Sequence, residues 1–222
     1  MNKPTHLFFR FLLFCCALTL TGCEKIGIHF PQSGAVPPGG LLFEDDFSHP
    51  PNGWGSMETR GGEIEFIFDG MMISIFLPNF MYWSVNGKEF SDVKVKVDAV
   101  LADGPQDDTF GVICRFQDDR NFYGFALSHD GYYGVFKYVD GKMNVLSNEG
   151  NLGFSEAIRT GGVVNHLEAT CERNVLRLRA NETLLTEVMD DQFESGKVGL
   201  IAGAYSEPGV RVFFDNFKVF QP

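Results

Sequence analysis

Residues 109–139 constrain the fold more than any other stretch, because they predict three consecutive antiparallel strands joined by two tight turns. In the first strand, apolar residues alternate with others, as in a strand that buries one face. These apolar residues are Phe110, Val112, Cys114 and Phe116. The polar residues 118–121 favour the first turn, and residues 129–131, which end in a glycine, favour a three-residue hairpin loop.

The apolar pattern also predicts how the first two strands pair. If Gln117 faces Phe122, every apolar residue of the first strand meets an apolar residue of the second on the same face. The predicted pairs are Cys114 with Phe125, Val112 with Leu127, and Phe116 with Tyr123. A slip of one residue would destroy this match, so the register is well specified. The opposite face is unusually aromatic and is expected to collect Arg115, Phe122, Tyr132, Phe136 and Tyr138.

The rest of the chain from residue 41 continues the same pattern of short strands and turns. About twelve strands recur every 8–12 residues with almost no helical periodicity, which indicates an all-β, two-sheet antiparallel sandwich or jelly roll. The 222 residues, 44% of them hydrophobic, are enough for one such domain, and no second domain is expected. The domain is predicted to span residues 41–222.

The N-terminus has the features of an export signal. Lys3 and Arg10 flank the start of an apolar run that is too short to span a bilayer comfortably. The run ends in Leu20-Thr21-Gly22-Cys23, which resembles the lipobox of bacterial lipoprotein signal peptides. The resemblance implies cleavage after residue 22, acylation of Cys23 with palmitate among its chains, and a membrane-anchored lipoprotein of the bacterial cell envelope. The alternatives are an ordinary secretory signal that happens to contain Cys23, or a short buried helix. Residues 23–40, rich in Pro and Gly, are expected to form a tether.

The charge of the chain limits its partners. Removing residues 1–22 takes away two of the 18 basic residues and none of the 29 acidic ones, so the formal charge falls from −11 to −13. A domain this acidic repels phosphate backbones, so no nucleic-acid partner is expected. It also repels anionic lipid surfaces, so membrane contact is expected only through the N-terminal lipid.

Four segments of the domain resemble a known family. They are FEDDFS with the following GW near residues 43–54, CRFQDDRNFYGF at 114–125, HLEATCERNVLRLRAN at 166–181, and VGLIAGAY with VRVFFDNFKV at 198–219. Together they resemble the concanavalin A-like lectin/glucanase jelly rolls, in the branch that includes laminin-G-like and 3-keto-disaccharide hydrolase domains. The resemblance covers roughly residues 41–220 and implies a jelly-roll fold more than an activity.

Two cysteines lie in the predicted domain, Cys114 and Cys171, and both fall on the inward face of a strand. Export places them in an oxidising compartment, so a disulfide is predicted. The alternative is a pair of buried free thiols that pack as small hydrophobic side chains.

A second candidate site lies where the two ends of the domain meet. The first and last strands of a jelly roll are neighbours, and oxygen ligands there suit a structural Ca²⁺. The candidate ligands are Glu44, Asp45, Asp46 and Asp215. The alternative is that these charges only decorate an edge strand and its turn.

The aromatic face is the candidate ligand site. Rings of Tyr and Trp stack on the apolar faces of sugars, and Trp83, with Tyr82, is expected to join this face. The alternatives are that loops or the tether cover the face, or that it is only an aromatic core.

No catalytic residues are predicted. Glu63 and Glu65 have the spacing of a carboxylate pair, but no third acid follows, and such residues on an edge strand are more often a solvated face.

The sequence therefore favours a non-catalytic, lectin-like binding domain that engages a glycan or an envelope protein. The alternatives are a glycoside-modifying enzyme of the 3-keto-disaccharide hydrolase type, or a purely structural lipoprotein.

Overall fold

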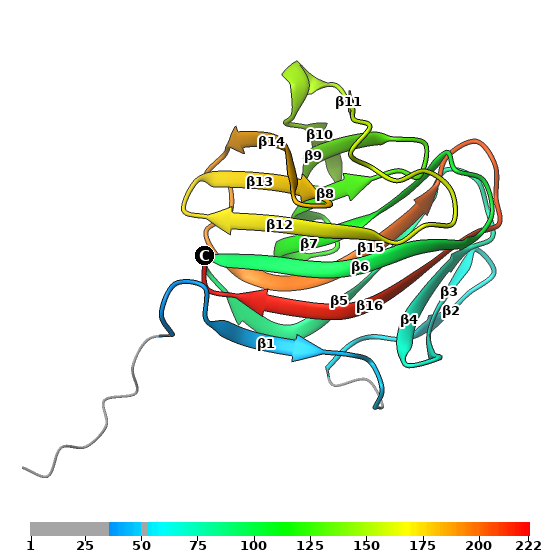
Figure 1. Ribbon diagram of the computed structural model, residues 1–222, viewed down its shortest axis with the longest axis horizontal. Helices are drawn as coiled ribbons and strands as arrows, with labels where there is room; N and C mark the ends of the chain where they lie inside the picture. The colour runs from blue at the N-terminus through cyan, green and yellow to red at the C-terminus, as the bar shows by residue number, and fades with distance from the viewer. Residues whose placement is uncertain (1–35, 50–52) are drawn as a thin grey trace, which may run out of the picture. The chain divides into compact units, whose positions relative to one another are not determined.

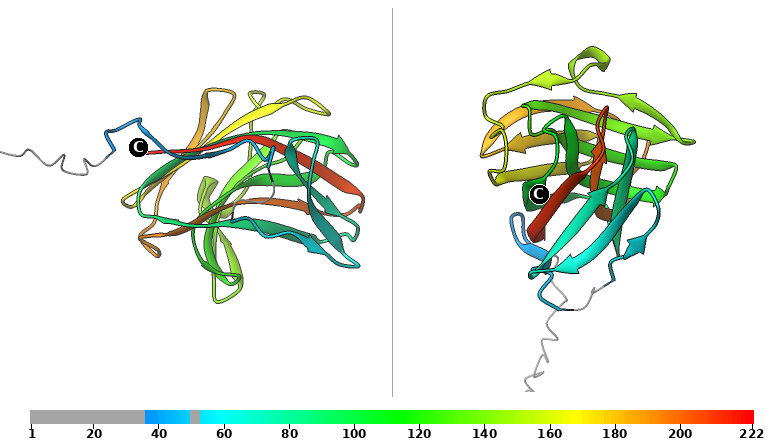
Figure 2. Two further views of the ribbon diagram at one scale, coloured as in Figure 1. Left: turned by 90° about the horizontal axis from the view of Figure 1, so that it is seen from below. Right: turned by 90° about the vertical axis from the view of Figure 1, so that its right-hand side faces the viewer.

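The computed structural model describes residues 36–49 and 53–222, and these form a sandwich of two antiparallel sheets (Figures 1 and 2). The strands are β1 (Leu41–Asp45), β2 (Met57–Glu58), β3 (Gly62–Ile67), β4 (Gly70–Ile75), β5 (Phe80–Phe90), β6 (Val93–Asp103), β7 (Asp108–Asp118), β8 (Asn121–Leu127), β9 (Tyr132–Val139), β10 (Lys142–Val145), β11 (Gly153–Phe154), β12 (Asn165–Glu172), β13 (Val175–Ala180), β14 (Thr183–Met189), β15 (Gly196–Ala204) and β16 (Val210–Phe220). A single 3-10 turn, η1 (Asn148–Gly150), interrupts them. No helix in this part of the chain is long and apolar enough to cross a membrane.

The two sheets have nine and seven strands. The nine-stranded sheet runs β14-β13-β12-β6-β16-β4-β3-β2, with β1 also paired to β16, and the seven-stranded sheet runs β10-β9-β8-β7-β15-β5, with β11 paired to β9. The first and last strands are therefore neighbours, as predicted, and Glu44 lies opposite Lys218. The predicted class, an all-β jelly-roll sandwich, is confirmed.

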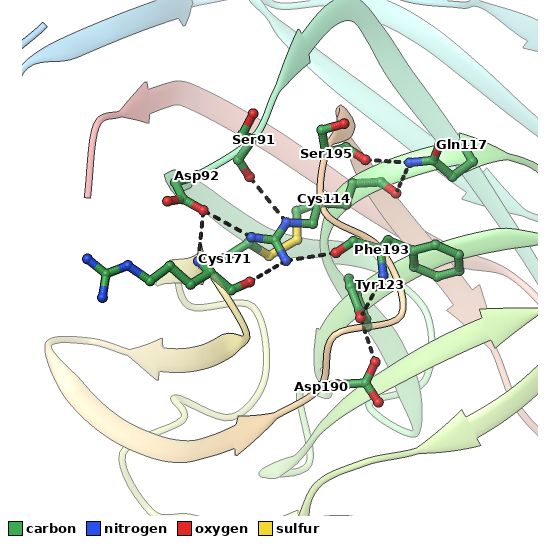
Figure 3. Close-up of a disulfide and its surroundings, with 11 residues drawn as sticks. Ser91, Asp92, Cys114, Gln117, Tyr123, Cys171, Asp190, Phe193 and Ser195 are labelled. Carbon is green, nitrogen blue, oxygen red and sulfur yellow. Dashed lines mark hydrogen bonds and ion pairs between the residues drawn. A yellow bond between two sulfur atoms is a disulfide. The ribbon is translucent and has the colours of Figure 1, made fainter. Parts of the chain in front are cut away.

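The core lies between the sheets and follows from the alternation in each strand. In β6, for example, Val93, Val95 and Val97 are fully buried, while Lys94 and Lys96 stay on the outer face. One covalent link crosses this core: Cys114 of β7 is bonded to Cys171 of β12, so the predicted disulfide is confirmed and joins the two sheets (Figure 3).

The predicted register of β7 and β8 was wrong beyond the turn. Asp118 faces Asn121 as expected, but Cys114 faces Tyr123 and not Phe125, a shift of two residues. A bulge between Cys114 and Asp118 causes the shift, and Arg115 within it has a φ of 51°. A shift of two keeps Phe110, Val112 and Cys114 on the inward face. The prediction for Phe116 was wrong, because the bulge turns it to the outer face beside Phe122.

The pattern also missed some elements. Strand β5 contains the polar run Asn86-Gly87-Lys88-Glu89, which hides its alternation. It nevertheless pairs with β15 over residues 80–85 and again at residues 89–90, on either side of an irregularity. Residues 148–162 contain η1 and the short strand β11, which the strand pattern of the sequence did not reveal.

Candidate functional site

The outer face of the seven-stranded sheet has two halves, and one of them is a small second core. Phe122 is fully buried and Phe136 almost so, together with Ile113, Phe116 and Ile201. The ring of Tyr138 stacks on Phe122 at 4.8 Å between centroids. This set, the outer aromatic cluster, shows that the predicted platform is packed against itself, as the aromatic-core alternative expected.

Trp83 covers part of this cluster. It projects from the edge strand β5, its ring lies 5.4 Å from that of Phe122 on β8, and its Nε1 donates to Asp119 Oδ1 at 3.1 Å. The prediction that Trp83 joins Phe122, Phe136 and Tyr138 is therefore confirmed as a placement. Tyr82 does not join them, because it points the other way and packs against the main core.

The predicted place of Arg115 on this face was wrong. The bulge turns its side chain to the end of the sandwich, where it is 1% exposed. Its Nε donates to Ser91 O at 3.2 Å, and its Nη1 donates to Phe193 O at 2.9 Å (Figure 3). Nη1 also donates to Arg173 O at 2.7 Å, and Nη2 pairs with Asp92 at 3.1 Å. Arg115 thus ties three loops together beside the disulfide.

The second half of the outer face is hollow. A pocket of about 340 Å³ opens where β7 begins and β15 ends, and we call it the tyrosine pocket. Its lining comprises Asp107, Thr109, Ala126, Leu127, Ser128, Asp130, Tyr132, Tyr133, Gly134, Leu152 and Tyr205. Tyr132 is therefore the one predicted ligand residue that lines it.

Small residues on adjacent strands make the floor of the tyrosine pocket. Gly134 of β9 pairs with Ala126 of β8, and neither has a side chain long enough to fill the space above the sheet. A Cβ at Gly134 would lie 2.8 Å from Leu152 Cδ2, so a larger residue there would enter the pocket.

Aromatic rings stand at its sides. Tyr132 is 45% and Tyr205 42% exposed, so both rings are available to a ligand. The short strand β11 supports one of them: Phe154 pairs with Tyr132 in the ladder, and its ring meets that of Tyr132 edge-on at 5.5 Å. Tyr138 packs against the outer aromatic cluster, and burial raises the pKa of its phenol. The phenol of Tyr205 raises the pKa of Tyr138 further.

A buried hydrogen-bonded pair, Asp108 and His129, lies next to the pocket lining. Asp108 Oδ2 is 2.6 Å from His129 Nδ1, and Asp108 Oδ1 accepts from the His129 backbone N at 2.8 Å. Burial raises the pKa of Asp108 despite these bonds. The pair fixes the loop between β8 and β9, which carries Ser128 and Asp130 of the pocket.

The predicted calcium ligands are only partly brought together. Glu44, Asp45 and Asp46 line a common hollow with Asn216, but Asp215 does not line it. Asp45 is already used, because it accepts from Phe47 N at 2.9 Å and from Trp54 Nε1 at 3.2 Å. Among residues 36–49 and 53–222, no three His, Cys, Asp or Glu side chains are arranged to hold a metal ion. Calcium binding stays a prediction without support from this geometry.

The two glutamates considered and set aside in the sequence do not line the tyrosine pocket. Glu63 and Glu65 are on β3 of the other sheet, and Glu65 Oε1 is 3.7 Å from Arg211 Nη2. Cys23, the signal peptide and most of the tether lie outside the described residues, so those predictions stay predictions.

Sequence reasoning missed most of the tyrosine pocket. Asp107 lies outside the segments singled out from the sequence, and Tyr205 entered only as the last residue of the VGLIAGAY segment of the family resemblance. The pocket residues come from four separate parts of the chain, which sheet order alone brings together.

Comparisons with known proteins agree with this fold. No protein-family model and no curated protein sequence matches the chain. Among solved structures, it is similar to the carbohydrate-binding module CBM66 from Bacillus subtilis, with a TM-score of 0.60, 17% identity, and coverage of 76% of this chain and 96% of that one. It is also similar to a protein of unknown function with a galectin-like fold from Bacillus subtilis, with a TM-score of 0.62, 13% identity, and coverage of 83% of this chain and 97% of that one. A beta-glucanase from Bacillus licheniformis has a TM-score of 0.60 and 9% identity, with coverage of 81% of this chain and 98% of that one. At these identities the likeness establishes the fold, and the chain has the concanavalin A-like, galectin-like jelly-roll architecture.

Proposed function

We propose that this protein is a membrane-anchored envelope lipoprotein whose jelly roll binds a glycan in the tyrosine pocket. The observation that carries the proposal is the pocket itself. Exposed tyrosine rings stand over a floor of small residues, with hydroxyl and carboxylate groups at the rim. Aromatic rings stack on sugar faces, while convergent polar groups fix their hydroxyls. The carbohydrate-binding module and the glucanase of similar fold support the same class of ligand.

The size and setting of the pocket suit the end of a glycan chain. Its volume of about 340 Å³ is near the lower limit for small-molecule sites. On one side the outer aromatic cluster fills the face of the sheet, so a long chain has no open path in that direction.

The position of the pocket suits a domain that is displayed from a surface. Leu41 pairs with Phe220 at one end of β16, whereas the pocket lies near the other end, where β15 leads into β16. The 11 residues of β16 span about 35 Å. A lipid on Cys23 would therefore hold the domain by the end opposite to the pocket.

Binding can be tested with a glycan array and affinity electrophoresis. Tyr132→Ala removes one exposed ring, and Gly134→Val fills the floor; each is expected to lower affinity at least about tenfold. Phe68→Ala is the matched control, because Phe68 is 85% exposed and lies in the turn between β3 and β4 of the other sheet. If wild-type protein binds no glycan, or if both pocket variants bind as well as wild type, the proposal fails.

The anchor is tested separately. Labelled palmitate is expected to be incorporated by the wild-type protein and lost in Cys23→Ser. Labelling that survives the substitution would contradict the lipoprotein part of the proposal.

Two carboxylates in the pocket also favour a second candidate, a glycoside-modifying enzyme. Asp107 and Asp130 both line the pocket, and hydrolysis of glycosidic bonds commonly uses two such groups. Release of reducing ends from a bound glycan, lost in Asp130→Asn, would support catalysis. Unchanged glycan after prolonged incubation would leave the binding function alone.

A further inference from the structure

The tyrosine pocket has a one-sided charge. Two of its lining residues, Asp107 and Asp130, carry carboxylates, and no Lys, Arg or His lines it. Asp107 Oδ2 accepts from Ser206 Oγ at 3.1 Å, and Asp130 Oδ1 accepts from Ser128 Oγ. Within the part of the chain that the structure describes, neither carboxylate is in an ion pair. Both therefore present negative charge to a ligand.

A histidine in the same loop does not cancel this charge. His129 follows Ser128 in the same loop, but its ring is fully buried and pairs with Asp108 at 2.6 Å. Any positive charge on that ring is matched by its own carboxylate. A ligand in the pocket therefore meets the two carboxylates and tyrosine rings, in a chain whose formal charge is −11.

This combination favours one kind of sugar. A protonated amine forms charge-assisted hydrogen bonds with carboxylates and is attracted to the face of an aromatic ring. A uronate or sulfate group meets like charge at short distance in a partly desolvated site. We infer that the tyrosine pocket selects glycans that carry an amine, accepts neutral ones more weakly, and rejects acidic ones. This inference rests on the proposed glycan-binding function.

The test uses an array on which each sugar backbone appears in neutral, amine-bearing and acidic forms. Glucosamine, N-acetylglucosamine and glucuronate oligomers form one such series, and galactosamine, galactose and galacturonate oligomers form another. The amine form of the bound backbone is expected to bind about tenfold more tightly than its neutral form. The acidic form is expected not to bind. Raising the ionic strength should reduce the advantage of the amine.

Substitutions then assign the effect to the two carboxylates. Asp107→Asn and Asp130→Asn are each expected to reduce the advantage of the amine about threefold, and the double variant should abolish it. Asp69→Asn is the matched control, because it removes the same charge from a hairpin turn of the other sheet, at a φ of 56° that Asn tolerates. A melting curve for each variant checks that the fold is intact.

The outcomes separate the two proposals. Glycan binding led by acidic sugars would overturn the charge inference and leave the binding function standing. An amine preference that persists in the double variant would do the same. Absence of binding to every sugar on the array would overturn the binding function and this inference with it.

Discussion

Replacing Arg115 tests the best-defined polar cluster in the molecule. Its guanidinium donates to Ser91, Arg173 and Phe193 carbonyls and pairs with Asp92. Arg115→Met keeps much of the side-chain volume but leaves these acceptors without their donor. Breaking a buried charged pair costs about 3–5 kcal/mol. Asp92 is 34% exposed and regains water, so we expect the lower part of this range, about 3 kcal/mol.

Urea unfolding followed by tryptophan fluorescence measures this change. The chain has two tryptophans, and they report on different regions: Trp54 lies in the main core and Trp83 on the outer aromatic cluster. A loss of about 3 kcal/mol should also lower the melting temperature by about 6–12 °C in a domain of this size. Glycan binding below the transition should be unchanged, because Arg115 and the tyrosine pocket lie at opposite ends of β7.

The matched control is Arg177→Met. Arg177 also pairs with carboxylates, Glu172 at 3.0 Å and Glu187 at 2.5 Å, but its side chain is 32% exposed. Such a surface network contributes at most about 1 kcal/mol. The reasoning is refuted if the free energy of unfolding of Arg115→Met lies within about 1 kcal/mol of the wild-type value. It is also refuted if Arg177→Met lowers the free energy of unfolding as much as Arg115→Met does.

Three further predictions concern the core, the outer cluster and pH. Replacing both Cys114 and Cys171 by Ser should cost about 4 kcal/mol, because the bond closes a loop of sequence separation 57; an unchanged urea midpoint would contradict this. Phe136→Ala should cost about 3–5 kcal/mol yet leave glycan binding intact, and lost binding in a folded variant would show that the cluster contacts the ligand. Burial acts to raise the pKa of Asp190, but hydrogen bonds from Lys137 and Tyr123 outweigh it and hold the pKa below its usual value. The stability that Asp190 contributes is therefore present above its unfolded pKa of about 3.9 and lost as the pH falls through the lower folded value. Melting temperatures measured against pH should accordingly fall less steeply for Asp190→Asn than for wild type, and parallel curves would contradict the linkage.

The outer aromatic cluster shows how far a strand pattern reaches. Alternation correctly placed Phe122, Phe136 and Tyr138 on one face, because successive side chains of a strand point to opposite sides. Alternation does not say whether that face is open. Trp83 from β5 packs against Phe122 on β8, although β15 and β7 lie between these two strands in the sheet. This long-range contact makes the predicted platform a packed cluster.

Arg115 shows a second limit. A bulge adds residues to one strand and breaks the alternation, so every prediction of side-chain direction beyond it changes. The hydrogen bonds of Arg115 go to the carbonyls of Ser91, Arg173 and Phe193, which are distant in the chain. A local sequence pattern cannot predict such contacts.

The sequence by itself determined the all-β class, the inward face of most strands, and the two cysteines that cross-link the sheets. These features depend on periodicity and on residue type, which are local properties of the chain. Only the tertiary structure decided where a ligand has room. The tyrosine pocket exists because β15, β7, β8 and β9 lie side by side and place Tyr205, Asp107, Ala126 and Gly134 around one hollow. A cavity is a property of spacing between distant segments, and strand order, not strand pattern, sets that spacing.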